Sequence, residues 1–384
     1  MTAAAPGAGP VLVMGAGTIG CWLGGRLQAA GVPVVFVGRP RVLAALREHG
    51  LTLTDLDAHR SHLPAQALAL HENVPAGIAP SLVLLAVKSG ATAEAAAALA
   101  SALPAGTPVV SMQNGLGNVA TAQAAAPGLR WLAGMVPYNV AEIAPGHFHR
   151  GTAGMLAAQD DPALREHAAA FARAGLALQL HKDLRAVQWG KLLLNLNNPV
   201  NALSGKPLRE ELMDRGYRQC FAALQTEALQ LLRGAGITPA QVAPLPPHRL
   251  PALMRLPNPL FRLIAARMLR IDAKARSSMA EDLALGRPTE IDALCGEVVR
   301  LAERQGRGAP INARMVALLQ AWPQRPVALG SRELKAALAA LVHTRADRAV
   351  QVAKVFLRRG AATALRAALP RPGRHRARCR AARA

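Results

Sequence analysis

Short, almost uninterrupted apolar runs recur along the first half of the chain, and stretches with helical patterns separate them. Four of these runs are residues 11–14, 33–37, 83–87 and 108–111. Such runs are typical of strands in a parallel sheet that is covered on both faces, because neither face of the strand meets water. The alternation therefore predicts an α/β domain with a parallel sheet over residues 9–183.

From about Asp183 onward the apolar positions follow helical spacing, which predicts an all-helical domain over residues 184–330. The pattern favours one long helix over 208–232 and an irregular, proline-rich crossing over 239–259. A chain of 384 residues is long enough for two such domains.

The acidic residues of this second half look mainly structural. The acid pairs at 210–211 and 281–282 are typical of solvated helix faces. Thr289 with Asp292 has the spacing of a capping box, which predicts the start of a helix. Glu290 then falls in the first helical turn, where an acid complements the helix dipole.

The most informative segment runs from Trp189 to Pro199. Read as a helix it is Leu-rich almost all round, yet Lys191, Asn195 and Asn198 share one stripe, at positions i, i+4 and i+7. Because buried polar groups need partners, this stripe either faces a polar ligand or consists of a snorkelling lysine and asparagines bonded to nearby loops. Pro199 has no N–H for the carbonyl of Asn195, so it predicts a kink there.

A glycine-rich turn follows the first predicted strand and precedes a helical pattern. The first glycine of its GxGxxG spacing permits the tight turn, the second lets a pyrophosphate approach, and the third lets helix and strand pack closely. The helix N-terminus then receives negative charge. This context favours dinucleotide binding over a purely structural turn, with the candidate residues Gly15, Ala16, Gly17, Thr18, Ile19 and Gly20.

The second predicted strand runs into Gly38 and Arg39 instead of an acidic residue. An acid there would accept hydrogen bonds from a free ribose 2′-OH, whereas an arginine favours a 2′-phosphate. Arg39 therefore favours NADPH over NADH, and the alternative is an ordinary surface arginine.

Lys88 and Asn114 follow the third and fourth apolar runs. A loop lysine is usually solvated and an Asn-Gly pair is usually a turn. However, ligands of parallel sheets gather beyond the carboxyl ends of the strands, where both residues are expected. This shared position makes Lys88 and Asn114 candidate site residues.

Charge changes the picture mainly at the C-terminal end. Of the formal net charge of +22, half lies in residues 341–384, which hold twelve of the 45 Lys and Arg and only one acid, Asp347. The last residues carry no aromatic side chain for base stacking, so nucleic acid is not the favoured partner. We assign residues 331–384 to a basic C-terminal extension with a disordered tip.

The remaining composition excludes several classes of protein. The four cysteines lack CxxC spacing and the histidines lack metal-ligand spacing, so neither a disulfide framework nor a metal site is expected. The N-terminus has no signal-peptide pattern, and no apolar run reaches the roughly 18 residues of a membrane span. We expect a cytoplasmic protein with no membrane partner.

Taken in order, five motifs of this chain resemble those of the ketopantoate reductase (2-dehydropantoate 2-reductase) family, over roughly residues 9–330. The resemblance implies an N-terminal Rossmann dinucleotide-binding domain, a C-terminal all-helical domain and an active site between them. It also implies NADPH-dependent reduction of ketopantoate to pantoate, in pantothenate synthesis. The motifs are residues 15–20, 84–88, 113–117, 190–195 and 277–292.

Two other functions stay open. One is the reduction of a different 2-keto acid by the same fold. The other is a non-enzymatic NADP-binding or nucleic-acid-associated protein that uses the basic tail. The oligomeric state is also open, with a homodimer as one option.

The resemblance assigns the substrate site to a few residues. Lys191 matches the lysine that hydrogen-bonds the C2 carbonyl and acts as general acid. Asn195 and Asn198 match amides that contact the substrate, and Ser278 matches the hydroxyl that binds its carboxylate. Asn114 matches an amide near both nicotinamide and substrate.

Three further positions match cofactor contacts: Lys88, Glu290 and Val140, the last at a backbone-contact position that a smaller residue usually occupies. The chain also departs from the family pattern. Asn198 follows Asn195 by three residues where four are common, and residues 206–208 lack an asparagine that some members carry. These departures concern recognition of the distal hydroxyl of the substrate.

Overall fold

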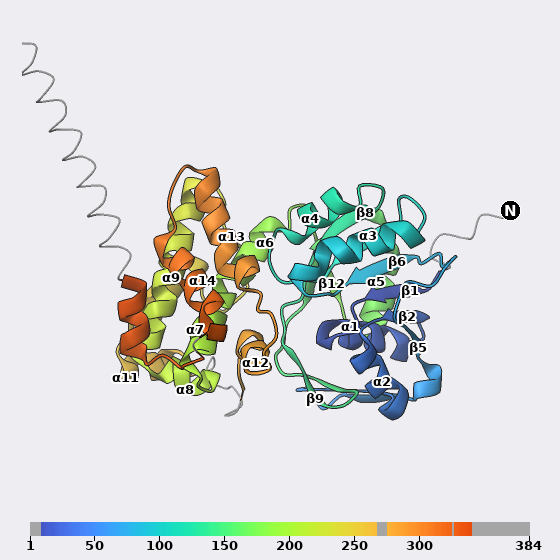
Figure 1. Cartoon of the computed structure of the whole chain (residues 1–384), viewed down its shortest axis with the longest axis horizontal. Helices are drawn as coiled ribbons and strands as arrows, with labels where there is room; N and C mark the ends of the chain where they lie inside the picture. The colour runs from blue at the N-terminus through green and yellow to red at the C-terminus, as the bar shows by residue number, and fades with distance from the viewer. Residues whose placement is uncertain (1–8, 267–274, 325, 340–384) are drawn as a thin grey trace, which may run out of the picture.

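The computed structural model describes residues 9–266, 275–324 and 326–339. Two domains lie side by side, a sheet domain and a helical domain, and α6 and α12 lie on the side of the helical domain that faces the sheet domain (Figure 1). The predicted fold class is confirmed, because the N-terminal domain is built on a largely parallel sheet and the C-terminal domain is helical.

The main sheet has eight strands in the order β12-β11-β8-β7-β6-β1-β2-β5. The six strands from β8 to β5 are parallel, and β11 runs antiparallel to β8. The strands are β1 (Val11–Met14), β2 (Val34–Val37), β5 (Ala69–His71), β6 (Leu82–Leu85), β7 (Pro108–Ser111), β8 (Arg130–Met135), β11 (Leu156–Gln159) and β12 (Leu178–His181).

The order of the strands creates a point where the chain changes direction. From β1 the chain proceeds to β2 and β5 on one side and then returns to β6 on the other side of β1. The loops that follow β1 and β6 therefore diverge, and in open α/β sheets ligands bind at such a point. The glycine turn and Lys88 lie in these two loops.

Helices cover both faces of this sheet, as the continuous apolar runs predict. Leu12, Val83 and Val109 face the core that α3 and α4 cover, whereas their neighbours Val13 and Leu84 face the core under α1. Both kinds of position are therefore buried, and no polar face is needed. The helices of this domain are α1 (Thr18–Ala29), α2 (Pro40–His49), α3 (Thr92–Ala102), α4 (Asn118–Ala125) and α5 (Pro162–Arg173).

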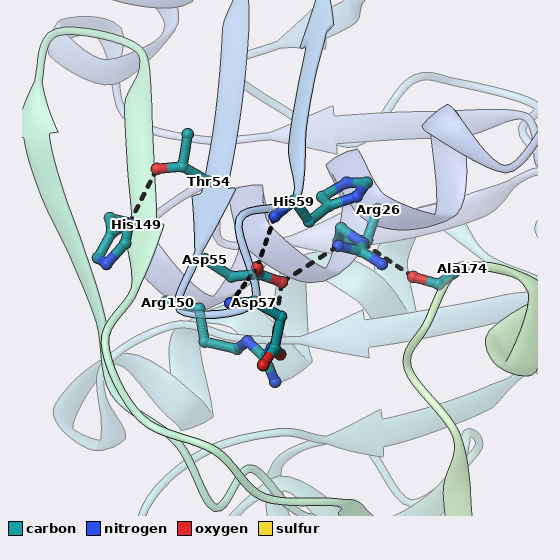
Figure 2. Close-up of polar contacts among 8 residues, drawn as sticks. All are labelled: Arg26, Thr54, Asp55, Asp57, His59, His149, Arg150 and Ala174. Carbon is teal, nitrogen blue, oxygen red and sulfur yellow. Dashed lines mark hydrogen bonds and ion pairs between the residues drawn. The ribbon is translucent and has the colours of Figure 1, made fainter.

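A second sheet of four strands packs on α1, which thus lies between two sheets. A buried polar cluster joins these layers (Figure 2): the Asp55 carboxylate lies 3.1 Å from Arg150 and 3.6 Å from Arg26 of α1. Arg26 also donates to the carbonyl of Ala174, after α5, at 2.8 Å. The strands are β3 (Leu51–Asp55), β4 (Arg60–Leu63), β9 (Val140–Ala144) and β10 (His147–Arg150).

The helical domain is centred on α9, whose buried face forms a core with its neighbours. Within the described residues, no helix combines the length and the hydrophobicity needed to cross a membrane. The helices are α6 (Arg185–Asn195), α7 (Asn197–Ser204), α8 (Leu208–Met213), α9 (Arg215–Gly234), α10 (Leu250–Arg255), α11 (Asn258–Ile264), α12 (Ser278–Ala284), α13 (Ile291–Arg304) and α14 (Pro310–Gln320).

Two predictions for this domain are wrong. The helix expected over 208–232 is divided at Asp214, whose carboxylate accepts a hydrogen bond from the Gly216 N–H at 2.7 Å and caps α9. This local cap outweighs the continuous apolar spacing. The proline-rich crossing contains α10 and the start of α11, because Pro251 and Pro259 occupy the first turns, where proline is tolerated.

Residues 331–339, the first part of the basic extension, are helical and pack on the helical domain. Leu334 and Leu338 are buried in its core, and the Ser331 hydroxyl donates to Asp214 at 2.8 Å. The tip that we expect to be disordered lies outside the described residues.

Candidate active site

The glycine turn after β1 has the geometry that its three glycines predict. Gly15 has φ +110°, and a Cβ there would lie 2.7 Å from the Val87 nitrogen, in the loop after β6. A Cβ on Gly20 would lie 2.0 Å from the Gly15 oxygen, whereas a Cβ on Gly17 would meet no atom within 4 Å. The turn is therefore tight on two sides and open at Gly17.

The helix that follows this turn offers unused positive potential. The N-cap of α1 is Gly17, which provides no side-chain acceptor, and the first turn contains no acidic residue. Thr18 and Ile19 lie in that turn, and Ala16 is buried before it. Free N–H groups and the helix dipole at such an end attract phosphate.

Arg39 lies at the carboxyl end of β2, the strand next to β1, and is the exposed N-cap residue of α2. Gly38, just before it, packs so closely that an added Cβ would lie 2.6 Å from the Ala16 Cβ. The structure thus places the arginine beside the glycine turn.

Polar contacts join the two domains beyond the ends of β6 and β7. Lys88 Nζ lies 2.7 Å from Asp282 on α12. Glu290, the N-cap residue of α13, accepts hydrogen bonds from the Asn114 side chain at 3.0 Å and from Ser89 at 3.2 Å. Three predicted site residues, Lys88, Asn114 and Glu290, therefore meet at the domain boundary.

These contacts correct two predictions. The side chain of Asp282 is only 8% exposed, so it is not part of a solvated helix face, and its partner is a lysine 194 residues earlier. The capping box of Thr289 and Asp292 does not form either, because Glu290 is the N-cap and makes no side-chain bond to the helix.

Lys191 projects from α6 toward the same boundary. Its ammonium group donates to Asn114 Oδ1 at 2.8 Å and to the carbonyl of Val136. Burial lowers the pKa of the Lys191 ammonium from 10.5 to about 8, and the nearby Glu290 carboxylate opposes this shift. The ammonium is therefore desolvated and fixed by two acceptors instead of snorkelling to the surface.

A narrow pocket lies beside this lysine, between α6, α13, the loop after β7 and the carboxyl end of β8. Asn114, Lys191 and Asn195 were expected there. Gln188, three residues before Lys191 on α6, was missed, although it continues the polar stripe toward the N-terminus of the helix. The other lining residues are Gln113, Gly115, Gly134, Met135, Leu192 and Leu294.

The polar stripe does not run along one straight helix. α6 ends at Asn195 and α7 begins at Asn197, so the helix is interrupted at Leu196. Pro199 explains this, because it cannot donate to the Asn195 carbonyl. As a result Asn195 lines the pocket and Asn198 does not.

Ser278 is the exposed first residue of α12. The N-cap of α12 is its neighbour Ser277, whose Oγ accepts a hydrogen bond from the Ala280 N–H at 3.2 Å. Ser277 Oγ also donates to the carbonyl of Asn198 at 3.2 Å, which links α12 to α7. Val140 opens β9 in the small sheet and is not among the residues that line the pocket.

No metal centre accompanies the pocket in the part of the chain that the structure describes, since no group of three or more His, Cys, Asp or Glu could hold an ion there. What the site offers is a buried ammonium, several amides and an open glycine turn. This set can stabilise developing negative charge on an oxygen and supply a proton to it.

Comparisons with known proteins give a consistent result for both domains. The family model described as ketopantoate reductase PanE/ApbA matches residues 11–161, and the one described as ketopantoate reductase PanE/ApbA C terminal matches residues 183–322. The 2-dehydropantoate 2-reductase of Halobacterium salinarum is 28% identical over 325 residues, which cover 81% of this chain and 97% of that protein.

Solved structures agree with this. A PanE/ApbA family ketopantoate reductase from Ralstonia eutropha JMP134 has a TM-score of 0.68 at 28% identity and covers 81% of this chain and 97% of its own. A D-mandelate dehydrogenase with NADH and anilino(oxo)acetate has a TM-score of 0.66 at 19% identity, with 81% and 97% covered, and shares the fold.

Proposed function

Because the chain belongs to the ketopantoate reductase family, a family of nicotinamide-dinucleotide-dependent oxidoreductases, we propose that it reduces ketopantoate to pantoate with NADPH, a step of pantothenate synthesis. The observation that carries this proposal is the Lys191 ammonium, which is desolvated beside a pocket at the domain boundary. A homodimer in the cytoplasm is part of the same proposal.

The residues of the glycine turn fit a dinucleotide. The open side of Gly17 leaves room for a pyrophosphate, and the uncapped start of α1 supplies N–H donors for it. Arg39, beside this turn, suits the 2′-phosphate of NADPH, and Lys88 and Glu290 are further candidates for contact with the cofactor.

The bound nicotinamide cofactor supplies hydride to the C2 carbon of the keto acid. Lys191 binds the C2 oxygen, stabilises the negative charge that grows on it and donates a proton to it. A pKa of about 8 suits this role, because the ammonium is still mostly protonated at neutral pH but releases its proton more readily than a solvated lysine. Asn114 orients the ammonium through its side-chain oxygen.

The remaining candidates bind and orient the substrate. Asn195 lines the pocket one turn after Lys191, so its amide can contact the keto acid directly. Asn198 and Ser278 lie on the adjoining helices α7 and α12, where the amide is proposed to bind the distal end of the substrate and the hydroxyl its carboxylate.

A substrate panel tests the proposal. Purified protein should oxidise NADPH with ketopantoate faster than with other 2-keto acids of similar size. The Lys191→Met variant should oxidise NADPH no faster with ketopantoate than with buffer. A protein that turns over another 2-keto acid well and ketopantoate no faster than buffer would instead be a reductase for that acid.

A further inference from the structure

Glu211 is a carboxyl group that the proposed chemistry does not use. The sequence places it in a solvated acid pair on α8, but the structure leaves it 0% exposed. Its neighbour Glu210 behaves as expected, because its side chain is 56% exposed and pairs with Lys206. Burial of an ionised carboxylate is costly unless charges or donors compensate it, so the partners of Glu211 decide its state.

Asn197, the first residue of α7, is the hydrogen-bonded partner of Glu211. Its side-chain N–H donates to Glu211 Oε2 at 2.9 Å. The other oxygen of each group, Glu211 Oε1 and Asn197 Oδ1, is buried without a donor among the described residues. A proton on the carboxyl group would turn one of these two acceptors into a donor, and an acid and an amide can then form two hydrogen bonds to each other.

In the described part of the helical domain, no cation forms an ion pair with Glu211 that would stabilise its ionised form. The basic group whose charge acts on Glu211 is Arg218 of α9, which donates to the carbonyls of Leu212, Met254 and Leu256 and makes no ion pair with Glu211. Burial raises the pKa of the Glu211 carboxyl to about 8. The amides of α7 and the charge of Arg218 oppose this rise, and Asp214 adds to it.

The pair adjoins residues that are proposed to bind the substrate, because Asn197 precedes Asn198 on α7 and α7 contacts α12. Asn197 follows the interruption at Leu196, so it fixes the direction in which α7 continues. The next turn of α7 holds the start of α12: Asn201 Oδ1 accepts from the Ser277 N–H at 2.9 Å, and the Asn198 carbonyl accepts from the Ser277 hydroxyl.

We propose that Glu211, protonated and paired with Asn197, is a positioning residue that holds Asn198 and Ser278 in place for the substrate. The inference rests on the proposed function, because it assumes that these two residues bind the keto acid. Glu211 itself touches neither substrate nor cofactor. It acts by fixing α7, and through α7 the first turn of α12.

Two substitutions of Glu211 distinguish the effect of its proton from the effect of its side chain as a whole. Glu211→Gln keeps a donor and an acceptor for Asn197 at every pH, so KM for ketopantoate should stay within about twofold of wild type at pH 7. Glu211→Ala should raise that KM by roughly tenfold or more, with the NADPH dissociation constant unchanged. The wild-type KM should rise as the pH passes about 8, whereas that of Glu211→Gln should not.

The matched controls are Glu210→Gln and Glu210→Ala, which change the exposed neighbour on the same helix and should alter neither constant. Equal rises in KM for Glu211→Gln and Glu211→Ala would show that the ionised carboxylate is needed and would overturn the proton assignment. A Glu211→Ala variant with lowered Tm and unchanged KM would overturn the positioning role. If that variant does not fold, the pH profiles of wild type and Glu211→Gln still decide.

Two measurements without turnover keep this inference separate from the proposed function. The infrared difference spectrum of wild type minus Glu211→Gln at pH 7 should contain the band of a protonated carboxylic acid, and a carboxylate band would refute the proton. Hydrogen exchange of the α7 and α12 amides should be faster in Glu211→Ala than in Glu211→Gln. Equal exchange would refute the positioning role, even if no 2-keto acid is reduced.

Discussion

Lys191→Met removes the ammonium from the proposed active site while nearly preserving the volume of the side chain. If this group stabilises the oxygen that gains charge and protonates it, its loss should lower kcat by roughly 10²–10⁴, or about 3–5 kcal/mol of transition-state stabilisation. NADPH binding should change little, because the glycine turn and Arg39 lie on the other domain.

The same substitution should leave stability nearly unchanged, for a reason that the structure supplies. The pKa of Lys191 is lowered from 10.5 to about 8, so the unfolded chain binds more protons between these values and the burial cost is fully present below about pH 8. That cost is about 3 kcal/mol, and methionine removes it. Two acceptors, Asn114 Oδ1 and the Val136 carbonyl, lose this donor, at about 1–3 kcal/mol each. The two effects have opposite signs and similar size.

The assay is NADPH oxidation at saturating ketopantoate, with urea unfolding at pH 7 on the same preparations. Lys182→Met, on an exposed lysine, is the control and should match wild type in both. The wild-type kcat should also fall above about pH 8, as Lys191 loses its proton. A folded Lys191→Met enzyme whose kcat stays within about tenfold of wild type would refute the assigned role.

Three further outcomes are expected. Arg39→Ala should weaken NADPH binding by about ten- to a hundredfold and leave NADH binding nearly unchanged in fluorescence titrations, because one charge-assisted phosphate contact is lost; equal losses would count against the contact. Asn198→Ala should raise KM for ketopantoate with little change in kcat, and a loss confined to kcat would contradict a ground-state contact. In urea unfolding, wild type should lose stability relative to Glu211→Gln as pH rises from 4.5 to about 8, by up to about 5 kcal/mol, because the folded state keeps a proton that the unfolded chain releases; parallel curves would refute this.

Features encoded by short-range pattern can be predicted from the sequence alone. β1, which precedes the glycine turn, is buried on both faces, and its continuous apolar run predicts this burial. Gly15 has a positive φ and Gly20 packs on the Gly15 carbonyl, so the requirement for glycine at these two positions is local, whereas Gly17 faces open space. The interruption near Pro199 is of the same kind, because it depends on one missing N–H.

Features that depend on distant partners cannot be predicted in this way. In the sequence, Asp282 and Glu211 look like solvated acids. Only the fold brings their partners to them: Lys88 pairs with Asp282, and Asn197 donates a hydrogen bond to Glu211. The helices of the proline-rich segment were missed because proline marks a break in the middle of a helix but is tolerated in its first turn.

The contacts that cross the domain boundary also restrict how such enzymes can be recombined. The Lys88–Asp282 pair and the contact of Asn114 with Glu290 each take one member from the sheet domain and the other from the helical domain. A chimera that joins the second half of this chain to the first half of a relative therefore inherits only the acidic member of each pair. Unless the relative supplies a matching group, the hybrid carries a buried carboxylate without its counter-charge. Domain exchange should give a folded hybrid when both members of each pair are transferred from the same enzyme.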